Sequence, residues 1–306
     1  MKAMRIHEPG GPEVLRYEDV PDPVPGPGEV LIHVHAAGVN PADRQAITWQ
    51  KTDRRYPWTP GYDVAGEILK PADDVSGYEP GTPVFGMLFP KPAGAYAQYV
   101  AAPVTQITAK PDTLEYEEAA ALPIVALTAW QALFETGGLS SGQTVLIHAA
   151  AGGVGHIAVQ LAKWKGARVI GIASGRNEQF LRTLGVDQFV DYNTTRFEDR
   201  VKEVDLVLEV FGGDTVERSL QVLKKGGTYV SIKRKHDPDL AARHGIHSKY
   251  VLARPDSSDL DQIAHLVDDG HVRPHIDKVF PLNQLAAAFE FNAAGHTRGK
   301  AVVSVS

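Results

Sequence analysis

The sequence contains no cysteine among its 306 residues. A chain without thiols has no disulfide bond, no thiolate zinc site, no iron–sulfur cluster and no cysteine nucleophile. It also lacks a long run of charges of one sign, and its 31 Lys and Arg against 37 Asp and Glu give a formal net charge of −6. This balance disfavours nucleic acid or an anionic membrane surface as the main partner.

No apolar run is long enough to predict a membrane span. The longest, residues 145–162, is interrupted by two histidines and a glutamine and contains three glycines, which indicates a buried turn of an α/β fold. Charged residues at positions 2, 5 and 8 precede any apolar run, so the first residues predict neither a secretory signal nor an anchor. The expected location is the cytoplasm.

The length predicts two domains at ~150 residues each. The first third is dense in Pro and Gly turns between short β-forming runs, which is typical of a β-rich domain. From about Tyr116, strand-like and amphipathic runs alternate, and this order predicts a parallel sheet with helices on both faces. Strands are expected at 144–148, 167–173, 188–191, 205–210, 228–232 and 249–254, and helices at 117–132, 154–164, 177–184, 215–223 and from about 257. The last part again reads as strand, helix and strand, and we expect it to return to the first domain.

A glycine-rich turn at residues 149–155 carries the chemistry. It follows an apolar strand and opens a helix, whose unpaired N-terminal amides suit a pyrophosphate. Against the dinucleotide fingerprint G-x-G-x-x-G, the chain has Ala150, Gly152 and Gly155. The strand–turn–helix context favours dinucleotide binding over a purely structural tight turn.

The residues at the end of the next strand indicate which dinucleotide the chain binds. An enzyme that binds NAD normally places an acid there for the ribose 2′-hydroxyl, but residues 172–177 contain none. Ser174 and Arg176 stand there instead, and a guanidinium suits a 2′-phosphate. NADPH is therefore the expected cofactor, and the alternative is that Arg176 is a solvated residue at a helix start.

Four motifs in order carry a family resemblance: GVNPAD at 38–43, PGYDVAG at 60–66, AAGGVG at 150–155 and RGKAVV at 298–303. The chain resembles the medium-chain dehydrogenase/reductase superfamily, and within it the zinc-free quinone oxidoreductase and alkenal/enone reductase branch, which is zeta-crystallin-like. The resemblance implies a Rossmann doubly wound parallel sheet inserted in a chaperonin-10-like β-barrel catalytic domain. The expected domains are 1–114 with 272–306 for the substrate and 115–271 for NADPH.

The resemblance also indicates whether a zinc ion is expected. Zinc-dependent relatives have a Cys where this chain has Asn40 and a His-Glu pair where it has Tyr62 and Asp63. Without a Lewis acid, ionising an alcohol is disfavoured, whereas hydride addition to a quinone or an enone needs only a donor that stabilises the developing enolate. No metal is expected.

The same resemblance implies the site residues. Asn40, Gln45 and Tyr62 are candidates for the substrate pocket, and Gln45 stands where some relatives have a Tyr, so no proton donor is assigned. Tyr192 is expected near the adenosine phosphate, or else as a core aromatic residue. The expected cofactor contacts are Asn40, Thr128, Ala151, Gly152, Gly153, Val154, Ser174, Arg176, Tyr192, Val210, Phe211, Gly212, Ser231, Ile232, Leu252, Ala253, Arg254, Arg298 and Lys300.

Two other features have plainer interpretations. His33 and His35 share one side of a strand, but no third ligand lies near them in sequence, so we interpret them as surface or packing residues. An aromatic and basic loop is either a lid over a flat substrate or an exposed loop; it contains Trp49, Lys51, Arg54, Arg55, Tyr56 and Trp58.

The sequence thus predicts an NADPH-dependent, zinc-independent oxidoreductase that acts on a quinone or an α,β-unsaturated carbonyl. The alternative is an NADPH-binding regulatory or structural protein with little turnover. The expected partners are a small electrophilic substrate and a second copy of the chain, paired through the apolar edge strand at 249–254.

Overall fold

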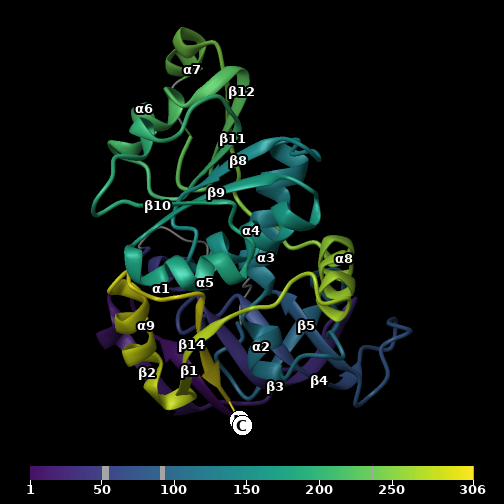
Figure 1. Ribbon diagram of the computed structural model, residues 1–306. Coiled ribbons are helices and arrows are strands. Elements are labelled where there is room, and N and C mark those ends of the chain that lie inside the picture. Colours follow the sequence, from purple (N-terminus) through teal and green to yellow (C-terminus); the bar gives the residue numbers. More distant parts are fainter. Residues whose placement is uncertain (50–54, 90–93, 236–237, 306) are drawn as a thin grey trace. The chain divides into compact units, whose positions relative to one another are not determined.

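The computed structural model describes residues 1–49, 55–89, 94–235 and 238–305 (Figure 1). The chain divides into two compact units. The β-rich unit comprises Met1–Ile124, Arg254–Gly270 and Pro274–Ser306, and the parallel-sheet unit comprises Val125–Ala253 and His271–Arg273. The predicted boundaries fell at 114 and 272 instead. Residues 115–124 and 254–270 group with the β-rich unit because helix α2 (Tyr116–Ala120) packs on strands of that unit and helix α8 (Ser257–Asp268) packs on its strand β7 (Ile107–Ala109).

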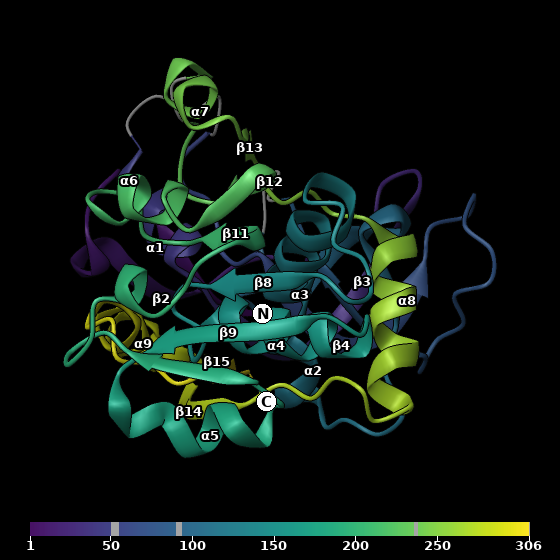
Figure 2. The same cartoon turned by 45° about the horizontal axis from the view of Figure 1, so that its top comes forward.

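Within the described part of the chain, the parallel-sheet unit contains six strands in the order β10-β9-β8-β11-β12-β13, all parallel (Figure 2). The strands are rich in buried Val, Leu and Ile, as expected for a sheet that is covered on both faces. Their bounds are Thr144–Ile147 (β8), Arg168–Ala173 (β9), Gln188–Asp191 (β10), Val204–Glu209 (β11), Leu223–Ser231 (β12) and His247–Tyr250 (β13).

Except for the first two, which precede β8, the helices of this unit connect successive strands, which is the arrangement that parallel pairing requires. They are α3 (Pro123–Trp130), the π-helix η3 (Gln131–Thr136), α4 (Gly153–Trp164), η4 (Gly175–Asn177), α5 (Glu178–Thr183), η5 (Phe197–Asp199), α6 (Thr215–Leu220) and α7 (Pro238–His244).

The β-rich unit is built from both ends of the chain, as predicted. Its large sheet has the order β14-β15-β3-β4-β5-β7, and β6 also pairs with β3. The C-terminal strand β15 pairs antiparallel with β3, so Val302 lies opposite Gly38. The bounds are Lys2–Ile6 (β1), Pro12–Val14 (η1), Leu15–Asp19 (β2), Glu29–Val39 (β3), Pro41–Thr48 (α1), Asp63–Pro71 (β4), Pro83–Met87 (β5), Tyr99–Pro103 (β6), Val104–Gln106 (η2), Ile276–Pro281 (β14), Leu282–Gln284 (η6), Leu285–Ala293 (α9) and Lys300–Ser304 (β15).

Three predicted elements differ from the structure. The helix expected over 117–132 is split between α2 and α3, because Pro123 cannot continue a helix that begins at Tyr116 and instead occupies the first turn of α3. The helix expected to reach 223 ends at Leu220, and β12 already begins at Leu223. The strand expected over 249–254 ends at Tyr250, so Leu252 and Ala253 lie in irregular chain.

The expected start of the helix near residue 257 is confirmed. Helix α8 begins at Ser257, and the carboxylate of Asp256 caps it by accepting from the amides of Ser258 at 3.1 Å and Asp259 at 3.2 Å. Among the helices in the described ranges, none has both the length and the apolar character needed to cross a membrane.

Candidate active site

The parallel-sheet unit has one edge at which a ligand-binding crevice is expected. The chain runs from β8 through β9 to β10 on one side and then through β11, β12 and β13 on the other, so β8 and β11 are neighbours at the reversal point. In open parallel sheets, ligands bind beyond the carboxyl ends of the strands at this reversal. Most predicted cofactor contacts of this unit follow those carboxyl ends: Ala151, Gly152, Gly153 and Val154 after β8, Ser174 and Arg176 after β9, Tyr192 after β10, Val210, Phe211 and Gly212 after β11, Ser231 and Ile232 at the end of β12, and Leu252 and Ala253 after β13. Thr128 lies instead on α3 and is buried.

The glycine-rich turn closes tightly between β8 and α4. Ala149 has a φ of +47°, a left-handed conformation that is rare for a residue with a side chain, and its carbonyl accepts from the Gly152 amide at 2.8 Å. Gly152 is the N-cap of α4, and no side chain caps the helix amides there. A Cβ on Gly155 would lie 2.1 Å from the Ala149 carbonyl oxygen, so only glycine permits this close packing. The turn has the features of a pyrophosphate-binding turn.

The corner after β9 contains the predicted phosphate-binding residues. Ser174 is fixed by Asn177, whose backbone amide donates to the Ser174 carbonyl at 2.9 Å and whose side-chain amide donates to the Ser174 hydroxyl at 3.1 Å. The Tyr192 amide donates to the Ala173 carbonyl at 3.3 Å, which brings Tyr192 next to this corner. Tyr192 is 55% exposed, so its alternative interpretation as a core aromatic residue is wrong.

Sequence reasoning missed an acid at this corner. Asp191 ends β10 and lies opposite Ala173 in the parallel register, and its Oδ2 is 2.6 Å from the point where a Cβ on Gly175 would lie. Its other oxygen accepts from the Asn193 backbone amide at 2.9 Å and the Asn193 side-chain amide at 3.1 Å. The carboxyl ends of neighbouring parallel strands meet at one edge, so the end of β10 could have been expected beside the corner at residues 172–177.

The loop after β11 is organised by a buried carboxylate that sequence reasoning also missed. Glu209 Oε1 accepts from the amides of Phe211 at 2.7 Å and Gly212 at 3.3 Å, and Oε2 accepts from the Thr215 hydroxyl at 2.9 Å. The Glu209 side chain is fully buried. Phe211 is 56% exposed.

A buried histidine lies beside this carboxylate. His148 Nε2 is 2.8 Å from the Ser219 hydroxyl and 3.7 Å from Glu209 Oε2. Burial lowers the pKa of His148 below its usual value, and Arg218 lowers it further, whereas the Glu209 carboxylate opposes the shift. The ring is therefore neutral at pH 7 and serves as a hydrogen-bonding partner for Ser219.

Ser231 ends β12 at the same edge, and Ile232 follows it. The Ser231 hydroxyl is buried and accepts from the amides of Lys233 at 3.2 Å and Arg234 at 3.3 Å, and Ile232 donates from its own amide to the Glu209 carbonyl at 3.1 Å. These contacts shape the loop after β12. Leu252 is 74% exposed.

In the β-rich unit, Asn40 lies in a buried polar cluster. Its backbone amide donates to Asp43 Oδ2 at 2.8 Å in the capping box of α1, and its side-chain Nδ2 donates to Asp63 Oδ2 at 2.8 Å. The ammonium of Lys300 donates to Asn40 Oδ1, to the Val39 carbonyl at 2.9 Å and to Asp63 Oδ2 at 3.4 Å. Asn40 is therefore held at both ends of its amide. Lys300 was expected to approach the cofactor, but its ammonium is directed at Asn40, Asp63 and Val39.

Burial shifts the pKa values of the charged groups in this cluster. Burial raises the pKa of Asp63, while Lys300 and the Asn40 hydrogen bond oppose that shift. Burial likewise lowers the pKa of Lys300, although Asp63 and Asp43 oppose it. Burial and then the Asp63 carboxylate raise the pKa of Asp43 to about 7. Asp43 also accepts from the Tyr62 amide at 3.0 Å, so the cluster includes the backbone of a second predicted pocket residue.

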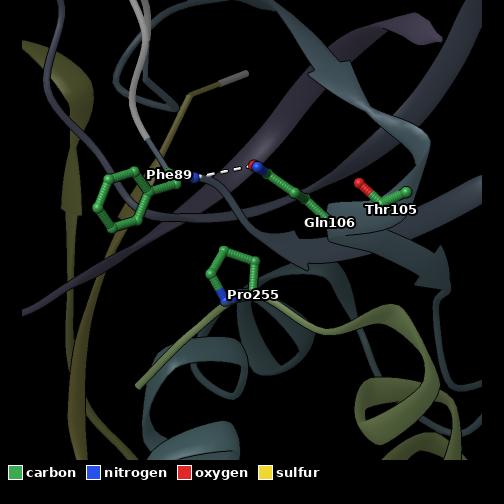
Figure 3. Close-up of a pocket in the computed structure, with 4 residues that line it drawn as sticks. All are labelled: Phe89, Thr105, Gln106 and Pro255. Carbon is green, nitrogen blue, oxygen red and sulfur yellow. Dashed lines mark hydrogen bonds between the residues drawn. The ribbon is translucent and has the colours of Figure 1, made fainter. Parts of the chain in front are cut away.

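Tyr62 is buried, whereas Gln45 is exposed on α1. The Tyr62 ring meets the Phe89 ring edge-on at 6.5 Å between centroids. Phe89 lines a cavity of about 410 Å³ with Thr105, Gln106 and Pro255, and its amide donates to Gln106 Oε1 at 2.9 Å (Figure 3). None of the predicted site residues lines this cavity.

The remaining predicted residues of this unit differ in exposure, and some lie outside the described residues. Arg254 pairs with Asp256 at 3.3 Å, and the Arg298 amide donates to Asp277 at 3.0 Å. Of the aromatic and basic loop, Trp49 is half-exposed and Trp58 is buried, which excludes Trp58 from an exposed lid. Lys51 and Arg54 lie outside the described residues.

The paired histidines pack against aromatic rings. His33 and His35 lie 4.7 Å apart between ring centroids, and His35 stacks on Tyr116 at 4.3 Å. His35 Nε2 lies 3.7 Å from Glu67. Over the described ranges, no group of three or more His, Cys, Asp or Glu side chains is arranged to hold a metal ion.

The contribution of the buried Lys300 ammonium to stability can be tested by substitution. We expect Lys300→Met to lower the free energy of unfolding by about 3 to 5 kcal/mol, because it leaves the Asp63 carboxylate buried without its cation. The double variant Lys300→Met/Asp63→Asn removes that carboxylate charge and should recover part of the loss. Urea unfolding of the three proteins measures both effects, and equal stability of the single and double variants would contradict the pairing.

Comparison with known proteins agrees with this geometry. Residues 26–112 match the alcohol dehydrogenase GroES-like domain, and residues 184–303 match the zinc-binding dehydrogenase family. The predicted fold, a GroES-like domain together with a Rossmann-like parallel sheet, is therefore confirmed.

Three similar proteins share nearly the whole chain. NAD(P)H oxidoreductase RTN4IP1, mitochondrial, of Danio rerio is 33% identical over 100% of this chain and 91% of its own. NADPH-dependent alkenal/one oxidoreductase, chloroplastic, of Arabidopsis thaliana is 31% identical over 99% of this chain and 79% of its own. The structure of the quinone oxidoreductase from Coxiella burnetii superposes with a TM-score of 0.90 at 35% identity, over 100% of this chain and 99% of that one. The chain therefore belongs to the medium-chain dehydrogenase/reductase superfamily of oxidoreductases, in the branch of the quinone and alkenal/one oxidoreductases.

Proposed function

We propose that the protein is a zinc-independent oxidoreductase that uses NADPH to reduce a quinone or an α,β-unsaturated carbonyl. The observation that carries the proposal is the carboxyl edge of the parallel sheet, where the glycine-rich turn, the Ser174–Arg176 corner and the loop after β11 meet. The relatives named for NADPH, alkenals and quinones support the cofactor and the substrate class.

The residues at this edge fit the two ends of NADPH. The uncapped amides of α4 and the close approach allowed at Gly155 suit the pyrophosphate. Ser174, Arg176 and the exposed Tyr192 suit the adenosine 2′-phosphate. Val210, Phe211, Gly212, Ser231 and Ile232 follow the strands at the nicotinamide half, and the bound nicotinamide supplies the hydride.

The substrate side is assigned to the β-rich unit, with Asn40, Gln45 and Tyr62 as the wall. Asn40 is held by Asp63 and Lys300, so its position is fixed before any substrate enters. A conjugated carbonyl needs only a hydrogen-bond donor to stabilise the enolate that forms on hydride addition.

The residues at the zinc-ligand positions do not fit a zinc ion. Asn40 and Asp63 already bind the Lys300 ammonium, a cation of this chain's own, and Tyr62 presents its backbone amide to Asp43. Zinc in such sites prefers thiolate and imidazole ligands, and the sequence contains no cysteine. We therefore derive no step through a metal.

The proposed activity can be tested with a panel of acceptors. We expect NADPH absorbance to decay at 340 nm with at least one quinone or enone, at a rate that EDTA leaves unchanged, and elemental analysis should find substoichiometric zinc. Binding of NADPH without turnover on any acceptor would favour a regulatory or structural protein instead. One zinc per chain, lost together with activity, would contradict zinc independence.

The cofactor preference depends on Arg176. A charged hydrogen bond contributes roughly 1.5–3 kcal/mol, which is about one to two decades in affinity at ~1.4 kcal/mol per decade. Arg176→Ala should weaken NADPH binding by that factor and leave NADH binding nearly unchanged, as measured by fluorescence titration. Arg182→Ala, which removes a neighbouring arginine paired with Glu178 on α5, is the matched control. Equal losses for both cofactors would contradict a phosphate contact.

We also propose a homodimer formed through strand β13. This strand ends the sheet order and pairs with β12, and Leu252 beyond it is 74% exposed. Sheet edges of this kind are commonly covered by a second copy. Sedimentation velocity at micromolar concentration should show a dimer that Leu252→Glu weakens, and a wild-type monomer would refute it. A cytoplasmic location stays a prediction, because some relatives are named as mitochondrial and another as chloroplastic.

A further inference from the structure

Glu209 is a fully buried carboxylate at the carboxyl end of β11, next to the predicted cofactor contacts Val210, Phe211 and Gly212. It accepts hydrogen bonds from three donors that all belong to the following loop and the start of α6. These are the Phe211 amide at 2.7 Å, the Gly212 amide at 3.3 Å and the Thr215 hydroxyl at 2.9 Å. One side chain thus folds the loop back onto the end of its own strand.

The loop has an unusual backbone that this side chain stabilises. Gly212 and Gly213 have φ values of +77° and +76°, so two successive residues are left-handed. The Thr215 hydroxyl also lies 2.9 Å from the Gly212 carbonyl, which links the loop to α6. Because Glu209 accepts from both amides and from the Thr215 hydroxyl, we expect the conformation of residues 210–213 to depend on its carboxylate.

Glu209 also lies where three strand ends meet. His148, the residue before the glycine-rich turn, has its Nε2 3.7 Å from Glu209 Oε2, and its backbone amide donates to the Leu208 carbonyl at 3.1 Å. The Glu209 carbonyl accepts from the Ile232 amide at 3.1 Å. The ends of β8, β11 and β12 are therefore fixed relative to one another around this residue.

We propose that Glu209 is a positioning residue, which holds loop 210–213 in the conformation that receives the nicotinamide half of the dinucleotide. The inference rests on the proposed function, since it assumes NADPH at this edge of the sheet. Glu209 does not itself touch the cofactor, because its carboxylate is buried and bonded to the loop and to Thr215.

The proposal predicts that substitutions at Glu209 separate the two halves of NADPH. Glu209→Leu removes every acceptor and should raise the Kd for NADPH at least tenfold and lower kcat. The same variant should bind adenosine 2′,5′-bisphosphate, which carries only the adenosine half, within twofold of wild type. A general loss of structure would weaken both ligands alike.

Conservative variants provide the rescue. In Glu209→Gln, the amide oxygen still accepts from Phe211 and Gly212, and the Thr215 hydroxyl can accept from the new amide while it donates to the Gly212 carbonyl. We expect its NADPH affinity to lie within threefold of wild type.

Thr215→Val removes only the hydroxyl link and should give a selective loss of about threefold for NADPH, so it decides the question if Glu209→Leu does not fold.

The matched control is Asp205→Asn, at the opposite end of the same strand. Asp205 also accepts a backbone hydrogen bond, from the Thr144 amide at 2.8 Å, and is ion-paired with Lys224. It should leave the affinities for both ligands unchanged. Fluorescence titration of NADPH and calorimetric titration of adenosine 2′,5′-bisphosphate measure these values.

Two results would overturn the proposal: equal losses of both ligands in the folded Glu209 or Thr215 variants, or unchanged affinity for NADPH in all of them. Failure of the proposed function has a different signature. In that case, the wild-type protein itself would bind neither NADPH nor adenosine 2′,5′-bisphosphate, or would bind NADPH without oxidising it with any acceptor.

Discussion

The parallel register of the six-stranded sheet is the constraint on which the candidate cofactor site depends. Because the strands run in one direction, residues after β8, β9, β10, β11 and β12 reach the same edge although up to 80 or so positions separate them in sequence. The register also pairs Asp191 with Ala173 and so brings an acid to the corner that holds Ser174 and Arg176. The chemistry at this edge is therefore set by strand ends rather than by any single motif.

Buried charged groups hold segments that follow strands in each of the two units. In the parallel-sheet unit, Glu209 satisfies the amides of Phe211 and Gly212. In the β-rich unit, the Lys300 ammonium and the Asp63 carboxylate hold the two ends of the Asn40 amide. In each case, burial of a charged side chain costs desolvation free energy, but its hydrogen bonds hold a residue of the proposed cofactor or substrate site in one position. A preorganised site requires such fixed positions.

The Lys300 cluster bears on the proposed zinc independence of a chain that matches the zinc-binding dehydrogenase family. A cation is supplied by the chain itself, and it is bonded to the residues at two of the positions where a metal would need ligands. The ammonium donates to three protein oxygens and so orients these side chains, but it has no vacant orbital and cannot act as a Lewis acid. Reduction of an activated double bond, which needs no Lewis acid, is consistent with this arrangement.

The sequence by itself determined the elements with strong local signals. The apolar run of β8, the glycine-rich turn and the amphipathic α4 were predicted nearly to their ends, and so was the return of the C-terminal strand to the β-rich unit. Tertiary structure alone decided the partners of Asp191, Glu209 and Lys300. Lys300 meets Asn40 only because β15 pairs with β3 in a register that places Ala301 opposite Val39. Strand and turn preferences arise from neighbouring residues, whereas such contacts depend on strand order and register, which form only when distant segments pack together.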